Sequence, residues 1–138
     1  ESIDLRIQNF LQTHYEEGNS SVIEKTINEL EEYFNKQRKI FTIPLLLAGT
    51  EFQIKVWEEL KKIHFGSTIS YLNLSQNLGN TKAIRAVASA NGANSISILI
   101  PCHRIIGTKG ELVGYAGGLE VKKRLLNLEQ DFELDLFS

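Results

Sequence analysis

The segment SYLNLSQNLGNTKAIRAVASAN, residues 70–91, carries the pattern that decides the fold of this chain. Ser70 can cap a short helix whose apolar side chains recur at helical spacing, and Gly79 supplies a tight C-terminal turn. Asn80 or Thr81 then caps a second helix, which we expect to run to the end of the segment. Two helices joined by a short turn that contains glycine form a helix-turn-helix pattern, although an ordinary helical hairpin is commoner.

The second of these helices has one face suited to close contact with another molecule. Lys82, Arg85 and Ser89 recur at i, i+3 and i+7, so they share that face. Alanines beside them keep the surface low, so the Arg85 side chain projects from it. This pattern favours DNA binding by the helix pair, but the spacing alone leaves the hairpin interpretation open.

Residues 80–125 are basic, whereas the rest of the chain is acidic. They hold 7 Lys and Arg against 2 Asp and Glu, a net charge of +5, in a chain of 138 residues with a net charge of −2. A local positive surface of this size suits a polyanion such as DNA. A solvated surface would show the same charges, so this observation does not separate the two interpretations.

Residues 1–49 are expected to form a small N-terminal domain that ends in a linker. The alternating apolar residues of 2–7 predict a strand, and a capping box beginning at Ser21 predicts a helix with one apolar stripe. The stripe consists of Ile23, Ile27, Leu30 and Phe34. Residues 40–49 predict an extended linker, because Pro44 resists helix there. The domain boundary therefore falls before residue 50.

Two further helices and a strand are expected around the quoted segment. A capping box at 50–53 opens one helix, which Gly66 ends, and four of its residues face inward. These residues are Phe52, Val56, Leu60 and Ile63. Residues 96–100, ISILI, predict a short buried strand. A final helix begins at the basic residues 122–124 and ends at Glu129.

These elements predict an α/β (α+β) protein with two domains. A small N-terminal α/β domain over residues 1–49 is followed by a mostly helical C-terminal domain over residues 50–138. The second domain contains the helix-turn-helix and a short strand and loop that carry Cys102. No apolar run reaches the roughly 20 residues of a membrane helix, and the N-terminus lacks the basic and apolar segments of a signal peptide. We therefore expect an intracellular protein that does not bind membranes.

Cys102 is the only cysteine of the chain. It excludes an internal disulfide, and together with three histidines it makes a closed zinc site with four ligands improbable. A single cysteine is either a small buried hydrophobe or a reactive thiol, and the first role is the commoner. Pro101 stiffens the backbone before the thiol. His103 follows at once and, in an extended segment, would reach the thiol only through a water or a bend.

The segment IPCHRII, residues 100–106, resembles the active-site signature of the O6-alkylguanine-DNA alkyltransferases. The resemblance also covers ISY at 69–71, RAV at 85–87, Asn94, GYAGGL at 114–119 and LLNLE at 125–129. These motifs keep their order and spacing across roughly residues 50–130. They outweigh the interpretation of Cys102 as a structural cysteine.

The resemblance implies that an alkyl group passes irreversibly from O6 of guanine in double-stranded DNA to Cys102. His103 would act on the thiol as a base through a water, and Glu129 would orient His103. The residues expected to contact the base or the DNA are Tyr71, Arg85, Asn94, Lys82, Ser89, Ile105, Tyr115 and Ala116.

Within that set, the resemblance assigns several separate roles. Tyr71 would help rotate the nucleotide out of the duplex, and Arg85 would fill the vacated space. Asn94 would brace the joint between the recognition helix and the active-site loop, while Tyr115 and the Ala116 backbone would line the pocket. The helix-turn-helix of this family enters the minor groove, which carries little sequence information and so suits damage at any position.

The resemblance further implies a monomer that needs no cofactor and no metal and that reacts once. It places such a protein in the cytoplasm of a prokaryote or the nucleus of a eukaryote, and it leaves O4 of thymine open as a second lesion. The chain departs from the family at Ser95, where many members have proline, and residues 1–49 are short for the family's N-terminal domain. One or two strands of that domain are therefore expected to be missing or reduced.

Three other functions remain open at this point. Some relatives recognise alkylated DNA without repairing it, but they lack the acceptor cysteine that this chain has. A regulatory helix-turn-helix protein could use Cys102 as a sensor, although no effector or dimerisation segment is evident. A Cys–His hydrolase would need an oxyanion hole, for which only the loop glycines are available.

Overall fold

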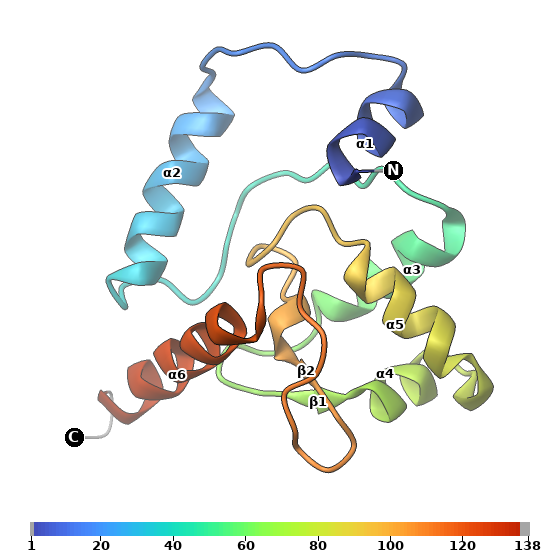
Figure 1. The fold of residues 1–138 in the computed structure, drawn as a ribbon. Coiled ribbons are helices and arrows are strands. Elements are labelled where there is room, and N and C mark those ends of the chain that lie inside the picture. Colours follow the sequence, from blue (N-terminus) through green and yellow to red (C-terminus); the bar gives the residue numbers. More distant parts are fainter. Residues whose placement is uncertain (1, 136–138) are drawn as a thin grey trace. The chain divides into compact units, whose positions relative to one another are not determined.

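The computed structural model describes residues 2–135, with only the backbone described for 132–135 (Figure 1). The chain divides into two compact units, Glu1–Ala48 and Gly49–Ser138. Helices are the main regular structure of both units. In the described part of the chain the only sheet has two short strands, and it lies in the second unit.

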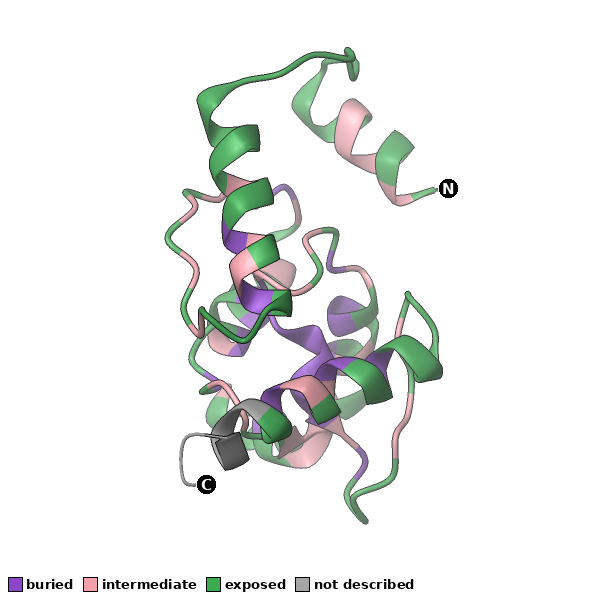
Figure 2. Ribbon diagram, turned by 90° about the vertical axis from the view of Figure 1, so that its left-hand side faces the viewer, coloured by how far each residue is buried: buried purple, intermediate pink, exposed green. Residues whose placement is uncertain are grey.

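The first unit begins with a helix, α1 (Ile3–Leu11), so the strand predicted for residues 2–7 is wrong. The Ser2 side chain accepts a hydrogen bond from the backbone of Leu5 and caps the helix. Asp4 adds a favourable charge to the first turn. No residue of α1 is buried (Figure 2), so the apolar alternation does not face a core.

The second helix, α2 (Ser21–Phe34), is present, but its cap is Ser20 and its predicted apolar stripe is wrong. Ile23, Ile27 and Phe34 are 45 %, 50 % and 51 % exposed. The buried residues of the helix are instead Glu29 and Tyr33.

The chain after α2 folds back and explains which side of the helix is buried. The Glu29 carboxylate accepts hydrogen bonds from the backbone N and Oγ1 of Thr42, at 2.7 and 2.6 Å. The Tyr33 ring packs against Phe41, with 5.5 Å between ring centroids. Burial tends to raise the pKa of Glu29, but the two Thr42 bonds and the charge of Arg38 hold it below its usual value. A hydrogen-bonded carboxylate, which a hydrophobic pattern cannot reveal, thus determines the packing.

The second unit opens with α3 (Glu51–Leu60), and its predicted capping box at Thr50 and Gln53 is confirmed. The helix ends at Leu60 rather than near Gly66. Val56, Leu60 and Ile63 are buried as predicted, whereas Phe52 is 38 % exposed. The sequence interpretation missed Trp57, whose buried indole N–H donates to the Ala90 carbonyl at 2.8 Å.

The predicted helix pair follows a short strand. Strand β1 (Ile69–Ser70) leads directly into α4 (Tyr71–Asn77), which Ser70 caps. Gly79 has a φ of +80°, the left-handed turn expected there. The second helix starts as a 3₁₀ turn, η1 (Thr81–Ala83), and continues as α5 (Ile84–Gly92).

Residues 96–100 form a tight turn, so the strand predicted there is wrong. Ile98 adopts a φ of +74°, which a β-branched residue rarely does. The second strand of the sheet comes later, at β2 (Ile105–Ile106), and it pairs in parallel with β1 through Ile69↔Ile105. The apolar residues of this run are indeed partly buried, but the backbone turns within it, which the sequence pattern did not indicate.

The last helix, α6 (Leu119–Asp135), begins earlier and ends later than predicted. Lys122, Leu125 and Glu129 are buried at i, i+3 and i+7, so they lie on the face turned to the core. Among the described residues, no helix is long and apolar enough to cross a membrane.

Candidate active site

Cys102 opens a single 3₁₀ turn, η2 (Cys102–Arg104), directly before β2. Pro101 has φ −80° and ψ 62°, and the Cys102 N–H donates to the Ile100 carbonyl at 2.8 Å. This is an inverse γ-turn, and Arg104 closes the next turn by donating to the Pro101 carbonyl at 3.0 Å. The backbone is therefore bent at the cysteine, where the sequence interpretation expected the end of an extended strand.

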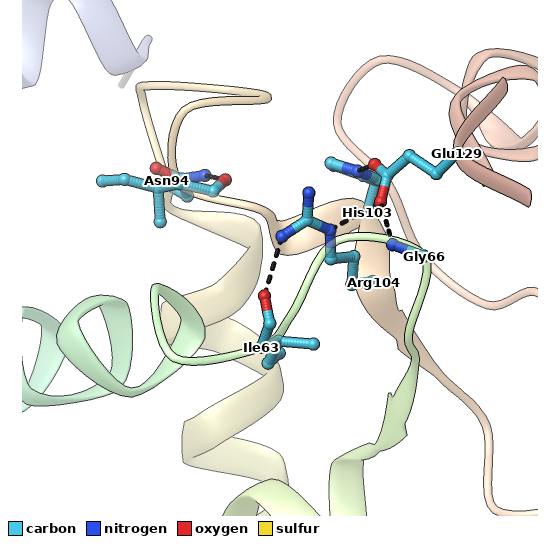
Figure 3. Close-up of polar contacts among 7 residues, drawn as sticks. Ile63, Gly66, Asn94, His103, Arg104 and Glu129 are labelled. Carbon is cyan, nitrogen blue, oxygen red and sulfur yellow. Dashed lines mark hydrogen bonds and ion pairs between the residues drawn. The ribbon is translucent and has the colours of Figure 1, made fainter. Parts of the chain in front are cut away.

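The Asn94 side chain stabilises this bend through hydrogen bonds to the backbone. Its Nδ2 donates to the Ile100 carbonyl at 3.0 Å, and its Oδ1 accepts from the backbone N of Ile96, also at 3.0 Å. The side chain is buried and lies between the end of α5 and the turn that carries the cysteine (Figure 3). This position is compatible with the bracing role that the family resemblance implies for Asn94, which stays a prediction.

The two residues that follow the cysteine belong to a buried network centred on the Glu129 carboxylate (Figure 3). Its Oε2 bonds Nε2 of His103, and its Oε1 accepts from Nε of Arg104 at 2.8 Å and from the Gly66 backbone at 3.0 Å. Arg104 also donates to the Ile63 carbonyl at 2.7 Å. The network joins three parts of the second unit: the segment after α3, the cysteine turn and α6.

Burial, hydrogen bonds and charge together set the protonation states of the members of this network. Burial tends to raise the pKa of Glu129, but His103 and Arg104 outweigh burial and lower it to about 2. Burial lowers the pKa of His103, although the Glu129 bond opposes this. His103 is therefore neutral at pH 7, and its Nε2–H donates to the carboxylate. Its Nδ1, a lone-pair acceptor, is buried and has no hydrogen-bond partner among the described residues.

The Cys102 thiol itself is not activated in this structure. Only 5 % of the residue is exposed, and burial raises its pKa above the usual value of 9.0. A hydrogen bond with Asn94 and the charge of Lys122 act in the opposite direction but do not compensate. The resting cysteine is therefore a neutral thiol next to a neutral base.

A cavity of about 100 Å³ opens at the cysteine. It is lined by residues of α4, α5, the cysteine turn and the glycine-rich loop before α6. These residues are Tyr71, Ala88, Asn91, Gly92, Asn94, Cys102, Gly114, Tyr115 and Ala116. The structure thus brings five of the predicted site residues together: Tyr71, Asn94, Cys102, Tyr115 and Ala116.

A family model for the DNA binding domain of 6-O-methylguanine DNA methyltransferase matches residues 51–131 of the chain. The match covers more than half of the sequence. The chain belongs to this family.

Relatives and solved structures of the family resemble the chain closely. A methylated-DNA–protein-cysteine methyltransferase of Methanosarcina acetivorans is 47 % identical over 111 residues, which is 80 % of this chain and 71 % of the relative. The inducible enzyme of that name from Bacillus subtilis is 46 % identical over 102 residues, 74 % of this chain and 57 % of the relative. The structure of Mycobacterium tuberculosis OGT in complex with DNA matches with a TM-score of 0.78 at 41 % identity, covering 84 % of this chain and 74 % of that one.

Three of the residues predicted to bind DNA lie away from the cavity of this alkyltransferase-family site. Lys82, Arg85 and Ser89 are all exposed on η1 and α5, as the predicted shared face requires. Ile105 is fully buried in β2 and does not line the cavity. Its side chain belongs to the core, so its position gives no support to the predicted contact with substrate.

The sequence interpretation missed three polar residues of the site. Arg104 and Lys122 are buried cations, and Asn91 is a buried amide in the cavity wall. The Lys122 ammonium donates to the carbonyls of Val113 and Gly114 at 2.8 and 3.2 Å and so ties the glycine loop to α6. The spacing of Lys122 seven residues before Glu129 could have indicated that both lie on the same inner helix face.

Proposed function

We propose that this chain repairs DNA by transferring an alkyl group from O6 of guanine to Sγ of Cys102. The observation that best supports this proposal is the position of Cys102 in a cavity wall. It is followed directly by a neutral His103 whose Nε2 is hydrogen-bonded to Glu129. The S–C bond forms as the C–O6 bond breaks, and the thiol proton leaves through a water to Nδ1 of His103. Guanine departs as an anion and takes one proton from water on a ring nitrogen, while His103 returns the thiol proton to solvent, so atoms and charges balance.

The burial of the thiol supports extrusion of the target base from the duplex. An O6-alkyl group lies inside the base stack, and Cys102 is only 5 % exposed, so the thiol and the alkyl group cannot meet in intact B-DNA. The exposed Lys82, Arg85 and Ser89 would hold the minor groove, with Arg85 in the space that the base leaves. An inserted side chain offsets part of the unstacking cost of a few kcal/mol.

The raised pKa of Cys102 supports positioning as the main source of rate. Lowering a thiol pKa by ~1.5 units would raise the thiolate fraction by at most about thirtyfold but reduce its nucleophilicity about fivefold, a net gain of about sixfold at most. Holding sulfur and alkyl carbon in line contributes up to ~7–11 kcal/mol in favourable cases. His103 therefore assists by taking the proton, and the cavity contributes more.

The product sets the stoichiometry. A thioether at Cys102 has no leaving group that water displaces, so each chain would react once and need no cofactor. We propose that the chain acts as a monomer on double-stranded DNA, in the cytoplasm of a prokaryote or the nucleus of a eukaryote. O4-alkylthymine would be the second lesion to examine.

Mass spectrometry of the protein after incubation with a duplex containing O6-methylguanine tests the proposal. One added methyl on the peptide that holds Cys102 is expected, and Cys102→Ala should show none. His103→Ala should react more slowly but measurably. Binding without any mass change would indicate a recognition module instead, and absence of both binding and transfer would exclude a role on this lesion.

A further inference from the structure

The mechanism above leaves one buried polar side chain of the cavity wall unused. Asn91 lies near the end of α5, is 5 % exposed and lines the cavity together with Cys102. Its Nδ2 donates to Oη of Tyr71 at 3.4 Å. Its Oδ1 is buried and has no hydrogen-bond partner among the described residues. A buried acceptor without a partner is costly, and a ligand in the cavity can supply one.

The bond to Tyr71 sets the polarity of both groups. Because Nδ2 donates to the phenol oxygen, the Tyr71 proton is left to donate elsewhere. This hydroxyl faces the glycine loop, since a Cβ at Gly114 would stand 3.6 Å from it. The wall therefore carries a donor, the Tyr71 O–H, and an acceptor, Oδ1 of Asn91, on neighbouring side chains.

An O6-alkylated guanine carries the complementary pair of groups. Alkylation at O6 removes the N1 proton, so both ring nitrogens of the six-membered ring become acceptors. The only N–H donor left on that ring is the 2-amino group, which lies between them. An O4-alkylated thymine has one acceptor ring nitrogen and no N–H donor, and O6-alkylhypoxanthine differs from O6-alkylguanine only in lacking the 2-amino group.

We propose that Asn91 is a specificity-determining residue whose Oδ1 accepts a hydrogen bond from the 2-amino group of the extruded base. The Tyr71 O–H donates to the adjacent ring nitrogen. This assignment rests on the proposed alkyl transfer and adds a preference to it. The site favours O6-alkylguanine over O4-alkylthymine, because only the purine satisfies the buried acceptor of Asn91.

The test compares two duplexes that differ only in the lesion, O6-methylguanine or O6-methylhypoxanthine, in single-turnover methyl transfer to Cys102. The wild-type chain should react about tenfold faster with O6-methylguanine, the value of one hydrogen bond between neutral groups. Asn91→Leu, which has similar volume and no polar atom, should bring the two rates within about twofold. Tyr71→Phe is the matched control: both bases have the ring nitrogen, so both reactions slow and the ratio persists.

Each outcome bears on Asn91 separately from the general function. Equal slowing of both substrates by Asn91→Leu, or equal wild-type rates on the two lesions, would overturn the assignment. Should Asn91→Leu not fold, Asn91→Ala carries the same expectation. Failure of the wild-type chain to accept methyl from O6-methylguanine would instead refute the alkyl transfer itself.

Discussion

The second unit places polar side chains in two opposite settings. His103, Arg104 and Glu129 are almost completely buried, the first two are bonded to Glu129, and Arg104 also bonds the segment after α3. Lys82 and Arg85 are exposed, and no side-chain hydrogen bond ties them to the rest of the described chain. The buried group joins the helices of the unit, whereas the exposed face contributes little to its packing.

This difference separates two kinds of functional residue. The groups that orient His103 beside Cys102 also stabilise the fold, so a single substitution among them reduces both activity and stability. The exposed cations can be changed with little effect on folding, because a surface side chain without partners contributes within about 0.5 kcal/mol. Loss of DNA binding and loss of folding should therefore be separable by residue.

The largest effect is expected for Glu129→Gln. The substitution leaves the buried Arg104 cation without its counter-charge, which costs about 3–5 kcal/mol of unfolding free energy. It also releases His103 from its fixed orientation, so methyl transfer falls as well. Urea unfolding and single-turnover transfer measure the two losses.

Glu120→Gln is the control for that substitution on the same helix. Glu120 pairs with Arg124 at 3.3 Å, but both side chains are more than 70 % exposed. Such a pair contributes about 0.3–0.5 kcal/mol. A loss at Glu129 no larger than that at Glu120 would mean that the buried network does not hold the unit together.

The pH dependence of stability is expected to be intermediate in size. Folding lowers the pKa values of both His103 and Glu129. Protonation of these groups therefore does not reduce the unfolding free energy at pH values above their unfolded pKa values of 6.5 and 4.5. As pH falls below 6.5, His103 binds a proton in the unfolded chain but not in the native protein. The unfolding free energy therefore decreases by up to about 1.4 kcal/mol per pH unit. A second decrease follows between pH 4.5 and about 2 as Glu129 is protonated.

Urea midpoints at pH 7.5, 6 and 5 measure the first decrease. His103→Gln should flatten it, whereas His64→Gln, at an exposed histidine of the same unit, should not. A slope that survives His103→Gln unchanged would place the titrating group elsewhere.

A comparison of the two units shows how much of the fold the sequence could predict. In the second unit, the capping box at Thr50, the cap at Ser70 and the turn at Gly79 are local signals, and the structure has all three. In the first unit, the strand at residues 2–7 and the stripe of α2 depended on which side faces a core. For α2 the bonds of Glu29 to Thr42 make that choice, and for residues 2–7 the Ser2 cap starts a helix in which no residue is buried, so the local pattern predicted both wrongly.

The candidate site was predictable where chemistry shows in the sequence and not where it depends on burial. Cys102, Tyr71 and Asn94 fall in matched motifs, and the cavity brings them together. Arg104 and Lys122 lie in a basic stretch, where a buried cation looks like a surface cation. Only the fold pairs one with Glu129 and the other with loop carbonyls.

The smallest change in stability, with a clear change in binding, is expected for Arg85→Ala. Without the Arg85 side chain, nothing occupies the space that the extruded base leaves in the stack. Affinity for a lesion duplex should therefore fall about tenfold, while the urea midpoint stays the same.

Lys82→Gln on the same face should act differently. It removes one phosphate contact, so it weakens binding to lesion and undamaged duplexes alike and lowers the slope of log affinity against log salt by about 0.9. Titrations of both variants at several salt concentrations distinguish the two roles. If Arg85→Ala weakened both duplexes equally and changed the salt slope as Lys82→Gln does, Arg85 would be one more phosphate contact, and another residue would have to fill the stack.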